Sequence, residues 1–255
     1  MSRKDDINKL YQPSKKMDKV RARLFCSDIV LSLLATVSTG PFKRILTIIL
    51  VVIAFVYMAL SIIDDGVLWY TAESARRKNN IQEAFHVRLD KYDTEGYYNN
   101  SIEEPDLSYA VNTFESAFFS KEISERMQWK AYVKIIISVI VIFVSCRLII
   151  DDEILLIIAQ TVFSAFVIEN SISLLLFSQR IKKLYDAAYH ELITVGISKY
   201  EQRVWLRYFC VEYESVKAHY KIRLDESLFQ TLNKPLSEEW NSIEKQIKII
   251  NDEKK

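Results

Sequence analysis

Glycine, proline and histidine are scarce in this chain of 255 residues, which has 4 glycines, 4 prolines and 3 histidines. Four scattered glycines provide no glycine-rich loop of the kind that cradles a phosphate group. The chain also lacks an HExxH motif, because His190-Glu191 is not followed by a second histidine at the required spacing. We therefore expect no catalytic residue, no metal and no cofactor, and we predict that the protein is not an enzyme.

Cysteine content and net charge exclude two further classes of protein. The 3 cysteines, Cys26, Cys146 and Cys210, lie far apart and form no CxxC motif. An odd number of distant cysteines argues against a disulfide framework, so we expect buried free thiols. The net charge of +1 predicts no global preference for nucleic acid or for acidic partners.

Long apolar stretches are present in residues 45–63, 135–150 and 154–177. They are almost free of charge, although the whole chain has 26% charged residues and a mean hydropathy of only +0.02. A helix of about 20 apolar residues crosses the ~30 Å hydrocarbon layer of a bilayer. These stretches therefore predict an all-α integral membrane protein.

A fourth apolar segment, 24–38, is shorter and contains Asp28, but the turn signal Gly40-Pro41 follows it directly. This order favours a tight helical hairpin and four spans, and the alternative is an interfacial helix before three spans. A signal peptide is not favoured, because its basic region would be shorter and residues 35–37 offer no small-residue cleavage site. The predicted parts are a basic N-terminus (1–23), a first transmembrane hairpin (24–63, with 24–39 weak and 45–63 strong), a helical insert (64–130), a second transmembrane hairpin (131–177) and a helical tail (178–255).

Basic residues near the ends of the apolar segments set the expected orientation. They cluster in 1–23, 76–78 and 180–183, and a four-span topology places all three groups on one side. By the positive-inside rule that side is the cytoplasm, so we expect a multi-pass protein with both termini cytoplasmic and the acidic turn 151–153 outside. Lys43 and Arg44 break the pattern and favour, as an alternative, a re-entrant first hairpin.

The tail and the insert are expected to be mostly helical. Residues 178–232 have no proline and one glycine, and their apolar residues recur at helical spacing in 181–195 and again in 208–232. The segment from Lys234 through Pro235 to Trp240 predicts a break and a new helix start.

Residues 92–105, in contrast, are rich in turn formers and predict a loop. Helix is expected to resume near Leu107, with a core-facing side formed by Ala110, Phe114, Phe118 and Ile123.

Polar residues inside the apolar stretches are candidates for a pore or gate, because such groups usually face a bundle interior or water. Counted from the acidic turn at about 1.5 Å per residue, Lys134 and Glu169 lie at the same depth and can pair, whereas Arg147 lies shallower. The alternative is that these side chains only join helices through hydrogen bonds. The candidate pore or gating residues are Lys134, Arg147, Glu169, Asn170, Ser171 and Ser173.

The order of the predicted parts can be combined with short motifs. Residues 77–85 contain Ile81-Gln82-Glu83, and residues 224–229 precede an ending with Pro235, Leu236 and Trp240. Together, over nearly the whole chain, these features resemble the SMODS-associated four-transmembrane effectors. The chain departs from that family in its short first span and in the loop around Tyr97-Tyr98.

That resemblance implies a bacterial anti-phage effector in the inner (cytoplasmic) membrane, encoded beside a nucleotidyltransferase. Such an effector senses a nucleotide second messenger, either a cyclic or a short linear oligonucleotide. It then permeabilises the membrane, so that the infected cell stops supporting the phage.

A nucleotide ligand needs cations for its phosphates and flat rings for its bases. The insert provides both, in Arg76, Arg77, Lys78, Tyr97, Tyr98, Lys121 and Arg126. The alternatives are that residues 76–78 only determine topology and that the two tyrosines only anchor their loop.

Four spans cannot enclose a wide pore alone, so we expect a homo-oligomer, for example a tetramer. The C-terminal helices are the expected assembly surface, with Tyr208, Tyr213 and Tyr220 beside Arg203 and Arg207 as a second possible ligand surface. The competing interpretation is a non-enzymatic membrane scaffold or transporter subunit that recruits a soluble partner through its helical tail.

Overall fold

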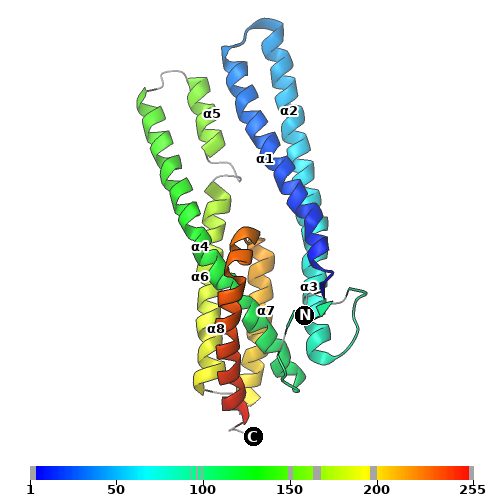
Figure 1. The fold of residues 1–255 in the computed structure, drawn as a ribbon. Helices are drawn as coiled ribbons and strands as arrows, with labels where there is room; N and C mark the ends of the chain where they lie inside the picture. The colour runs from blue at the N-terminus through cyan, green and yellow to red at the C-terminus, as the bar shows by residue number, and fades with distance from the viewer. Residues whose placement is uncertain are drawn as a thin grey trace.

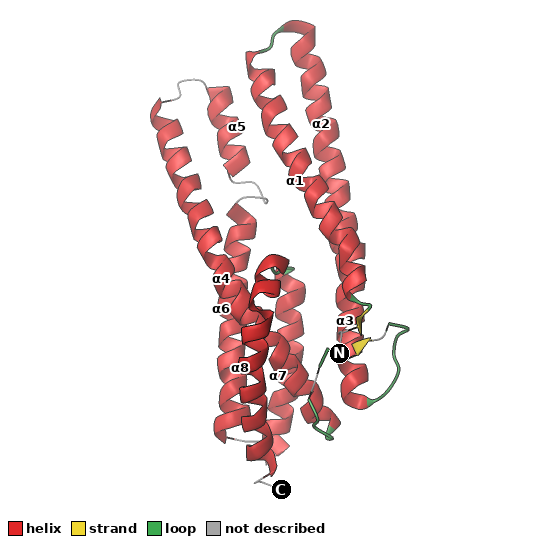
Figure 2. Ribbon diagram, in the orientation of Figure 1, coloured by secondary structure: helices red, strands yellow, loops and turns green. Residues whose placement is uncertain are grey.

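The computed structural model describes residues 4–92, 94–95, 97–98, 100–148, 152–162, 168–195 and 200–252. In these ranges the chain is almost entirely helical (Figures 1 and 2). Lys4–Asp5 (β1) and Thr94–Glu95 (β2) form a two-residue antiparallel pairing, and short loops join some of the helices. The predicted all-α class is confirmed, whereas expectations that involve residues 149–151, 163–167 or 196–199 lie outside the described residues.

The first hairpin consists of α1 (Asn8–Val37) and α2 (Gly40–Ile63), which pack side by side (Figure 1). Gly40 has a φ of 65°, a left-handed conformation that favours glycine. Pro41 lies in the first turn of α2, where a missing backbone N–H is tolerated. The predicted turn is confirmed, and α1 joins the basic N-terminal segment and the weak apolar segment into one helix.

The helix of α2 does not end at the last residue of its apolar stretch. It continues through a π-helical segment, η1 (Asp64–Leu68), into α3 (Trp69–Phe85). His86 then ends α3 in the left-handed conformation with a φ of 54°. One continuous helix of 46 residues, Gly40–Phe85, therefore joins the apolar and polar halves of the molecule.

The remaining described helices form a second hairpin and a bundle (Figure 1). They are α4 (Pro105–Leu148), α5 (Asp152–Val162), α6 (Asn170–Tyr189) with its π-helical extension η3 (His190–Val195), α7 (Tyr200–Tyr220) and α8 (Glu226–Asp252). The lower halves of α4 and α6 pack together and against α7, and α8 packs on α4. The described residues of 92–104 form no helix, and α4 begins at Pro105, in agreement with the predicted restart of helix near Leu107.

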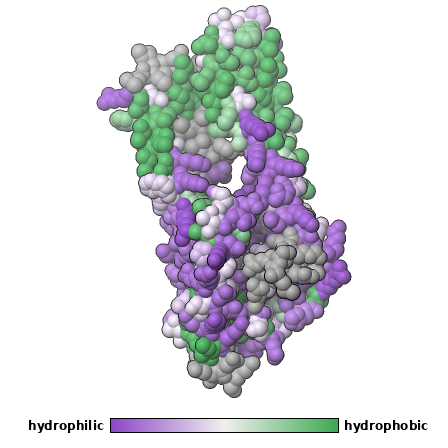
Figure 3. Space-filling view, in the orientation of Figure 1, coloured by the Kyte–Doolittle hydropathy of each residue, from purple (hydrophilic) through white to green (hydrophobic). Residues whose placement is uncertain are grey.

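Two helical stretches, Gly40–Phe85 and Pro105–Arg147, are long and apolar enough to cross a membrane. Only 6% and 17% of their most apolar 18-residue windows are buried by the rest of the chain. Core helices of a soluble bundle would be mostly buried, whereas here large apolar side chains such as Val51, Phe55 and Phe143 are exposed. Figure 3 shows this apolar surface over the half of the molecule that holds the turn between α1 and α2.

The core lies in the polar half, between α4, α6, α7 and α8. Phe114 is fully buried and contacts the rings of Tyr185, Phe209 and Trp240. The predicted core-facing side of α4 is confirmed, because Ala110, Phe114, Phe118 and Ile123 are all buried.

The predicted helix start near Pro235 is wrong, because Pro235 lies inside α8. The break between helices falls instead at residues 221–225, where Lys221 has a φ of 50°. Asp225 begins α8 by accepting hydrogen bonds from the backbone N–H groups of Ser227 and Leu228. Burial of Leu232, Leu236 and Trp240 on one face holds α8 together across the proline.

The predicted apolar stripe of the tail is partly wrong. Val216 and Leu232 are buried as expected, but Tyr208 and Val211 are exposed. Tyr213 is buried in the core, so Tyr208 and Tyr213 do not lie on one surface.

Replacing Phe114 with alanine removes the ring at the centre of this core. We expect the free energy of unfolding to fall by about 3–5 kcal/mol, the usual loss for a buried phenylalanine. Chemical denaturation in detergent micelles measures this loss. Ile249→Ala on the exposed side of α8 is the control, and equal losses in the two variants would contradict the assigned core.

Candidate functional site

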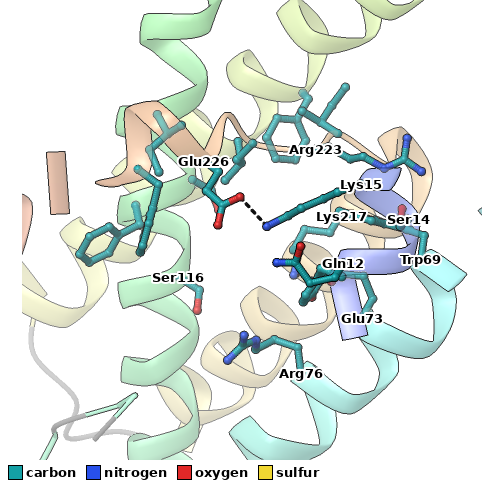
Figure 4. Close-up of a pocket in the computed structure, with 18 of the residues that line it drawn as sticks. Gln12, Ser14, Lys15, Trp69, Glu73, Arg76, Ser116, Lys217, Arg223 and Glu226 are labelled. Atoms are coloured by element: carbon teal, nitrogen blue, oxygen red, sulfur yellow. Dashed lines mark hydrogen bonds and ion pairs between the residues drawn. The ribbon is translucent and has the colours of Figure 1, made fainter. Parts of the chain in front are cut away.

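A pocket of about 730 Å³ lies where the first hairpin meets the bundle. Its volume is within the ~300–1,000 Å³ typical of small-molecule sites. The walls come from the first half of α1, from α3, α4 and α7, and from the segment that joins α7 to α8 (Figure 4). The pocket is therefore closed by elements far apart in the sequence.

The lining is rich in cations and aromatic rings. Six cationic side chains line it against four acidic ones, and eight aromatic rings are distributed among them. The cations are Lys15, Lys16, Lys19, Arg76, Lys217 and Arg223; the acids are Asp18, Glu73, Glu115 and Glu226; the rings are those of Tyr11, Trp69, Tyr97, Tyr98, Phe119, Phe177, Tyr213 and Phe229.

One wall is an ion pair between α3 and α7. Lys217 Nζ lies 2.6 Å from Glu73 Oε2, and the Tyr11 hydroxyl donates a 2.9 Å hydrogen bond to Glu73 Oε1. Burial opposes charge on Glu73, but Lys217 outweighs it and holds the pKa of Glu73 below its ordinary value. Burial likewise opposes charge on Lys217, but Glu73 and Glu214 raise its pKa well above the ordinary value. Both groups are therefore charged at neutral pH.

Three of the residues predicted from the sequence also line the pocket. The Arg76 guanidinium lies 4.0 Å from the centre of the Tyr97 ring, and the Tyr97 and Tyr98 rings pack edge to face. The Tyr98 hydroxyl lies 3.3 Å from that of Ser116 on α4. Burial raises the pKa of Tyr98 well above its ordinary value, so the hydroxyl stays neutral. Arg76, Tyr97 and Tyr98 thus come together in one pocket, and their binding of a ligand stays a prediction.

An ion pair crosses the pocket. Lys15 Nζ on α1 lies 2.7 Å from Glu226 Oε2 at the start of α8, as Figure 4 shows. Both side chains are partly exposed, so the pair is screened by water and costs little to open. A ligand anion can therefore take the place of Glu226 beside Lys15.

Arg223 joins the pocket to the joint of the long helix. Its guanidinium donates a 2.8 Å hydrogen bond to Asp18 on α1, and others of 2.7 and 3.3 Å to Asp64 and Asp65 in η1. The same group lies 5.1 Å from the centre of the Trp69 ring. Arg223 thus binds the α7–α8 segment to both helices of the first hairpin.

Asp64 is the buried centre of this cluster, with 0% of its side chain exposed. It also lies 3.0 Å from Arg21, which in turn pairs with Asp18 and donates to the Ser61 hydroxyl. A buried carboxylate is costly unless it is paired, so Asp64 needs both guanidinium groups. The π-helical segment that presents Asp64 is of a kind often found at functional sites.

The arrangement is suited to a phosphorylated ligand with flat rings. Lys15, Lys19 and Arg223 can neutralise phosphate, and the aromatic lining can stack bases, each stack contributing ~1–3 kcal/mol. Among the residues that the structure describes, no group of His, Cys, Asp and Glu side chains could hold a metal ion.

The other predicted ligand residues lie outside the pocket lining. Arg77 pairs with Glu214, and Lys78 pairs with Asp90. Lys121 pairs with Glu122 and lies over the Tyr185 ring, and Arg126 is exposed on α4. Neighbours in the sequence diverge here because successive residues of a helix point to different faces.

The candidate pore residues lie in the second hairpin. Lys134 and Arg147 are exposed on α4, and Glu169 and Asn170 are exposed at the start of α6. Ser171 is buried and Ser173 half-buried on the same helix. Their role in a pore stays a prediction.

The two arginines of the expected second ligand surface at the tail already form ion pairs within the chain. Arg203 lies 3.1 Å from Glu104, and Arg207 pairs with Asp106. The basic pocket residues that sequence reasoning missed come instead from α1 and from residues 217–223. One feature of the sequence could have pointed to Arg223 as a site residue. It directly precedes the 224–229 segment that supports the family resemblance.

Comparisons of this chain with protein-family models, with curated proteins and with solved structures give no match.

Replacing Lys217 with methionine leaves Glu73 buried beside fewer cations. We expect the free energy of unfolding to fall by about 3–5 kcal/mol at pH 7. Burial should then raise the pKa of Glu73, so that part of the loss is recovered as the pH falls and the carboxyl group is protonated. Chemical denaturation repeated at intervals of about one pH unit between pH 5 and pH 8 measures how the free energy of unfolding depends on pH.

The double variant Lys217→Met/Glu73→Gln is the control. It should regain much of the stability and lose the added pH dependence. A Lys217→Met variant whose stability does not respond to pH in this window would contradict the assigned pair.

Proposed function

We propose that this chain is a membrane effector that binds a nucleotide in the pocket and, in response, permeabilises the bilayer that holds its two hairpins. The observation that carries the proposal is that a pocket of cations and aromatic rings is joined through Arg223 to the base of an apolar hairpin. The resemblance to SMODS-associated four-transmembrane effectors supports the same function and adds its setting. That setting is a bacterial inner membrane during phage infection, with the nucleotide made by a companion nucleotidyltransferase.

Four spans are the topology we propose for the hairpins. The exposed apolar surface of α2 and α4 supports it, because an apolar area of this extent favours lipid over water. The upper part of α1 pairs with α2, and α5 and α6 pack against α4. Lys43 and Arg44, just after the turn at Gly40, then lie at the far headgroup layer, while the pocket and both termini lie on the cytoplasmic side.

The proposed mechanism is competition for Arg223. With no ligand, Arg223 is shared by Asp18, Asp64 and Asp65. A phosphate group in the pocket offers a stronger partner for the same guanidinium. Once Arg223 turns toward the ligand, the α7–α8 segment is released from η1, and α2 can move relative to the bundle. The nucleotide opens the protein because the released arrangement binds it more tightly.

Leakage of liposomes tests the function directly. Purified protein in dye-loaded liposomes should release dye and potassium when one of a panel of cyclic and linear oligonucleotides is added. Arg76→Gln should raise the nucleotide concentration for half-maximal leakage about 10- to 100-fold, since a hydrogen bond to a charged group contributes about 1.5–3 kcal/mol.

Lys78→Gln is the matched control, because Lys78 lies two residues away but pairs with Asp90 outside the pocket lining. Equal effects of the two variants would remove the pocket from the proposal. A protein that never leaks, with any nucleotide, would favour the scaffold instead.

Removing the Arg223 contacts should open the protein without a ligand. We expect Arg223→Gln to leak in the absence of nucleotide, with the closed state weakened by about 1–3 kcal/mol, a 5- to 150-fold change. Arg223→Lys should be intermediate, since an ammonium group cannot reproduce the fork of a guanidinium.

The control for this experiment is Lys130→Gln, which removes an exposed pair with Asp225 in the same region. Circular dichroism establishes that each variant is folded. If the folded Arg223→Gln variant leaks no more than the wild type in the absence of nucleotide, Arg223 does not hold the closed state.

A further inference from the structure

One helix of the bundle has apolar residues on both of its faces. On α7, Leu206, Phe209, Tyr213 and Val216 face the core and are buried. On the opposite face Tyr200, Val204, Tyr208 and Val211 are 79%, 46%, 56% and 66% exposed. A helix in contact with water on one side normally carries polar residues there. The outer face of α7 therefore has the composition of a covered surface.

The outer face also has a regular spacing. Val204, Tyr208, Val211, Ser215 and Ala218 are all exposed and follow one another at intervals of four, three, four and three residues. Alternating intervals of this kind are the a and d positions of a heptad repeat, which place a seam of side chains against a second helix. The seam contains small and apolar side chains over the whole length of α7.

Charged residues flank the seam on its two edges. Arg207 lies on one edge, at a heptad g position, and Glu212 lies on the other, at an e position. In a parallel helix pair a g residue faces the e residue that lies five positions later on the neighbouring helix, which is the spacing of Arg207 and Glu212. An antiparallel pair with the same seam in register would place Arg207 against Glu214, the next g residue. The charges therefore match a second helix of the same sequence in either orientation, and the orientation follows from the membrane.

We infer that the outer face of α7 binds α7 of a second copy of this chain in parallel. The inference rests on the proposed function in one respect, because insertion of all copies into one bilayer gives them a common orientation. Figure 1 shows α7 lying along the long axis of the molecule, which the two hairpins also follow, so copies related by rotation about the membrane normal have parallel α7 helices. Arg207 already pairs with Asp106, but 65% of its side chain is exposed and free to reach a second carboxylate.

This contact gives the bundle a role beyond ligand binding. It brings the hairpins of neighbouring copies around one axis, which is what a pore wider than four helices requires. The pocket residues Lys217 and Tyr213 lie on the inner side of the same helix, so each copy offers its ligand site and its assembly face on opposite sides of α7.

The mass of the purified protein in detergent tests the contact without any nucleotide. We expect the wild type to be larger than a monomer, and Val211→Glu to be a monomer at the same concentration. Ile249→Glu is the control, since Ile249 is 58% exposed on α8, away from the seam. A monomeric wild type, or a Val211→Glu variant with the wild-type mass, would overturn the inference.

Disulfide cross-linking tests the parallel arrangement. In a background with Cys26 and Cys146 replaced by serine, Val204→Cys alone and Ala218→Cys alone should each form a disulfide-linked dimer on oxidation. Antiparallel pairing would instead link the copies only when both cysteines are present, and that result would overturn the inference. Charge exchange adds a second test: Arg207→Glu and Glu212→Arg should each weaken assembly at least tenfold, and the double variant should restore it.

These readouts separate the inference from the proposed function. Cross-linked dimers without any nucleotide-dependent leakage would leave the α7 contact in place and remove the effector function. Leakage by a protein that forms no cross-link through α7 would do the reverse.

Discussion

The buried carboxylate of Asp64 is the point on which the two halves of the molecule depend. It lies inside the joint between an apolar helix and a polar one, and two arginines from different elements neutralise it. Arg21 comes from α1, so its ion pair with Asp64 joins the two helices of the first hairpin. Arg223 comes from the bundle, so it ties the bundle to the hairpin. Because a charge without a partner is so unfavourable there, this one group fixes the relative position of three segments that are distant in sequence.

The pocket follows from the same arrangement. Once Arg223 is held against Asp18 and Asp64, the segment after α7 lies against α1 and η1, and it closes a space lined by residues of α1, α3, α4 and α7. They present an excess of cations and rings, and three of the cations, Lys15, Lys217 and Arg223, are already paired with acids of the chain itself. The pairs keep the pocket stable when it is empty, and they are weak enough at Lys15 and Glu226 for an anion to replace them.

The sequence predicted well those features that depend on local pattern. The long apolar stretches, the turn at Gly40 and the buried side of Phe114 and Phe118 each follow from the spacing of residues in one segment. Pro235 was misplaced, because burial of its neighbours on the core outweighed the local preference of proline. Of seven proposed ligand residues, Arg76, Tyr97 and Tyr98 line the pocket. Lys15 and Lys217 could not be found this way, since only the folded chain brings α1, α7 and the α7–α8 segment to one pocket.

The number of residues in the π-helical segment between α2 and α3 determines how α3 is rotated relative to α2. Each residue of an α-helix turns the chain by about 100°. A π-helical segment spans one more residue between hydrogen-bonded groups than an α-helix does. The phase of α3 relative to α2 is therefore set by how many residues lie between Asp64 and Leu68. Loss of a single residue there would rotate Glu73 and Arg76 away from the pocket by about a quarter of a turn. Insertions and deletions at this joint would therefore disconnect the site from the hairpin even though every contacting side chain is left unchanged.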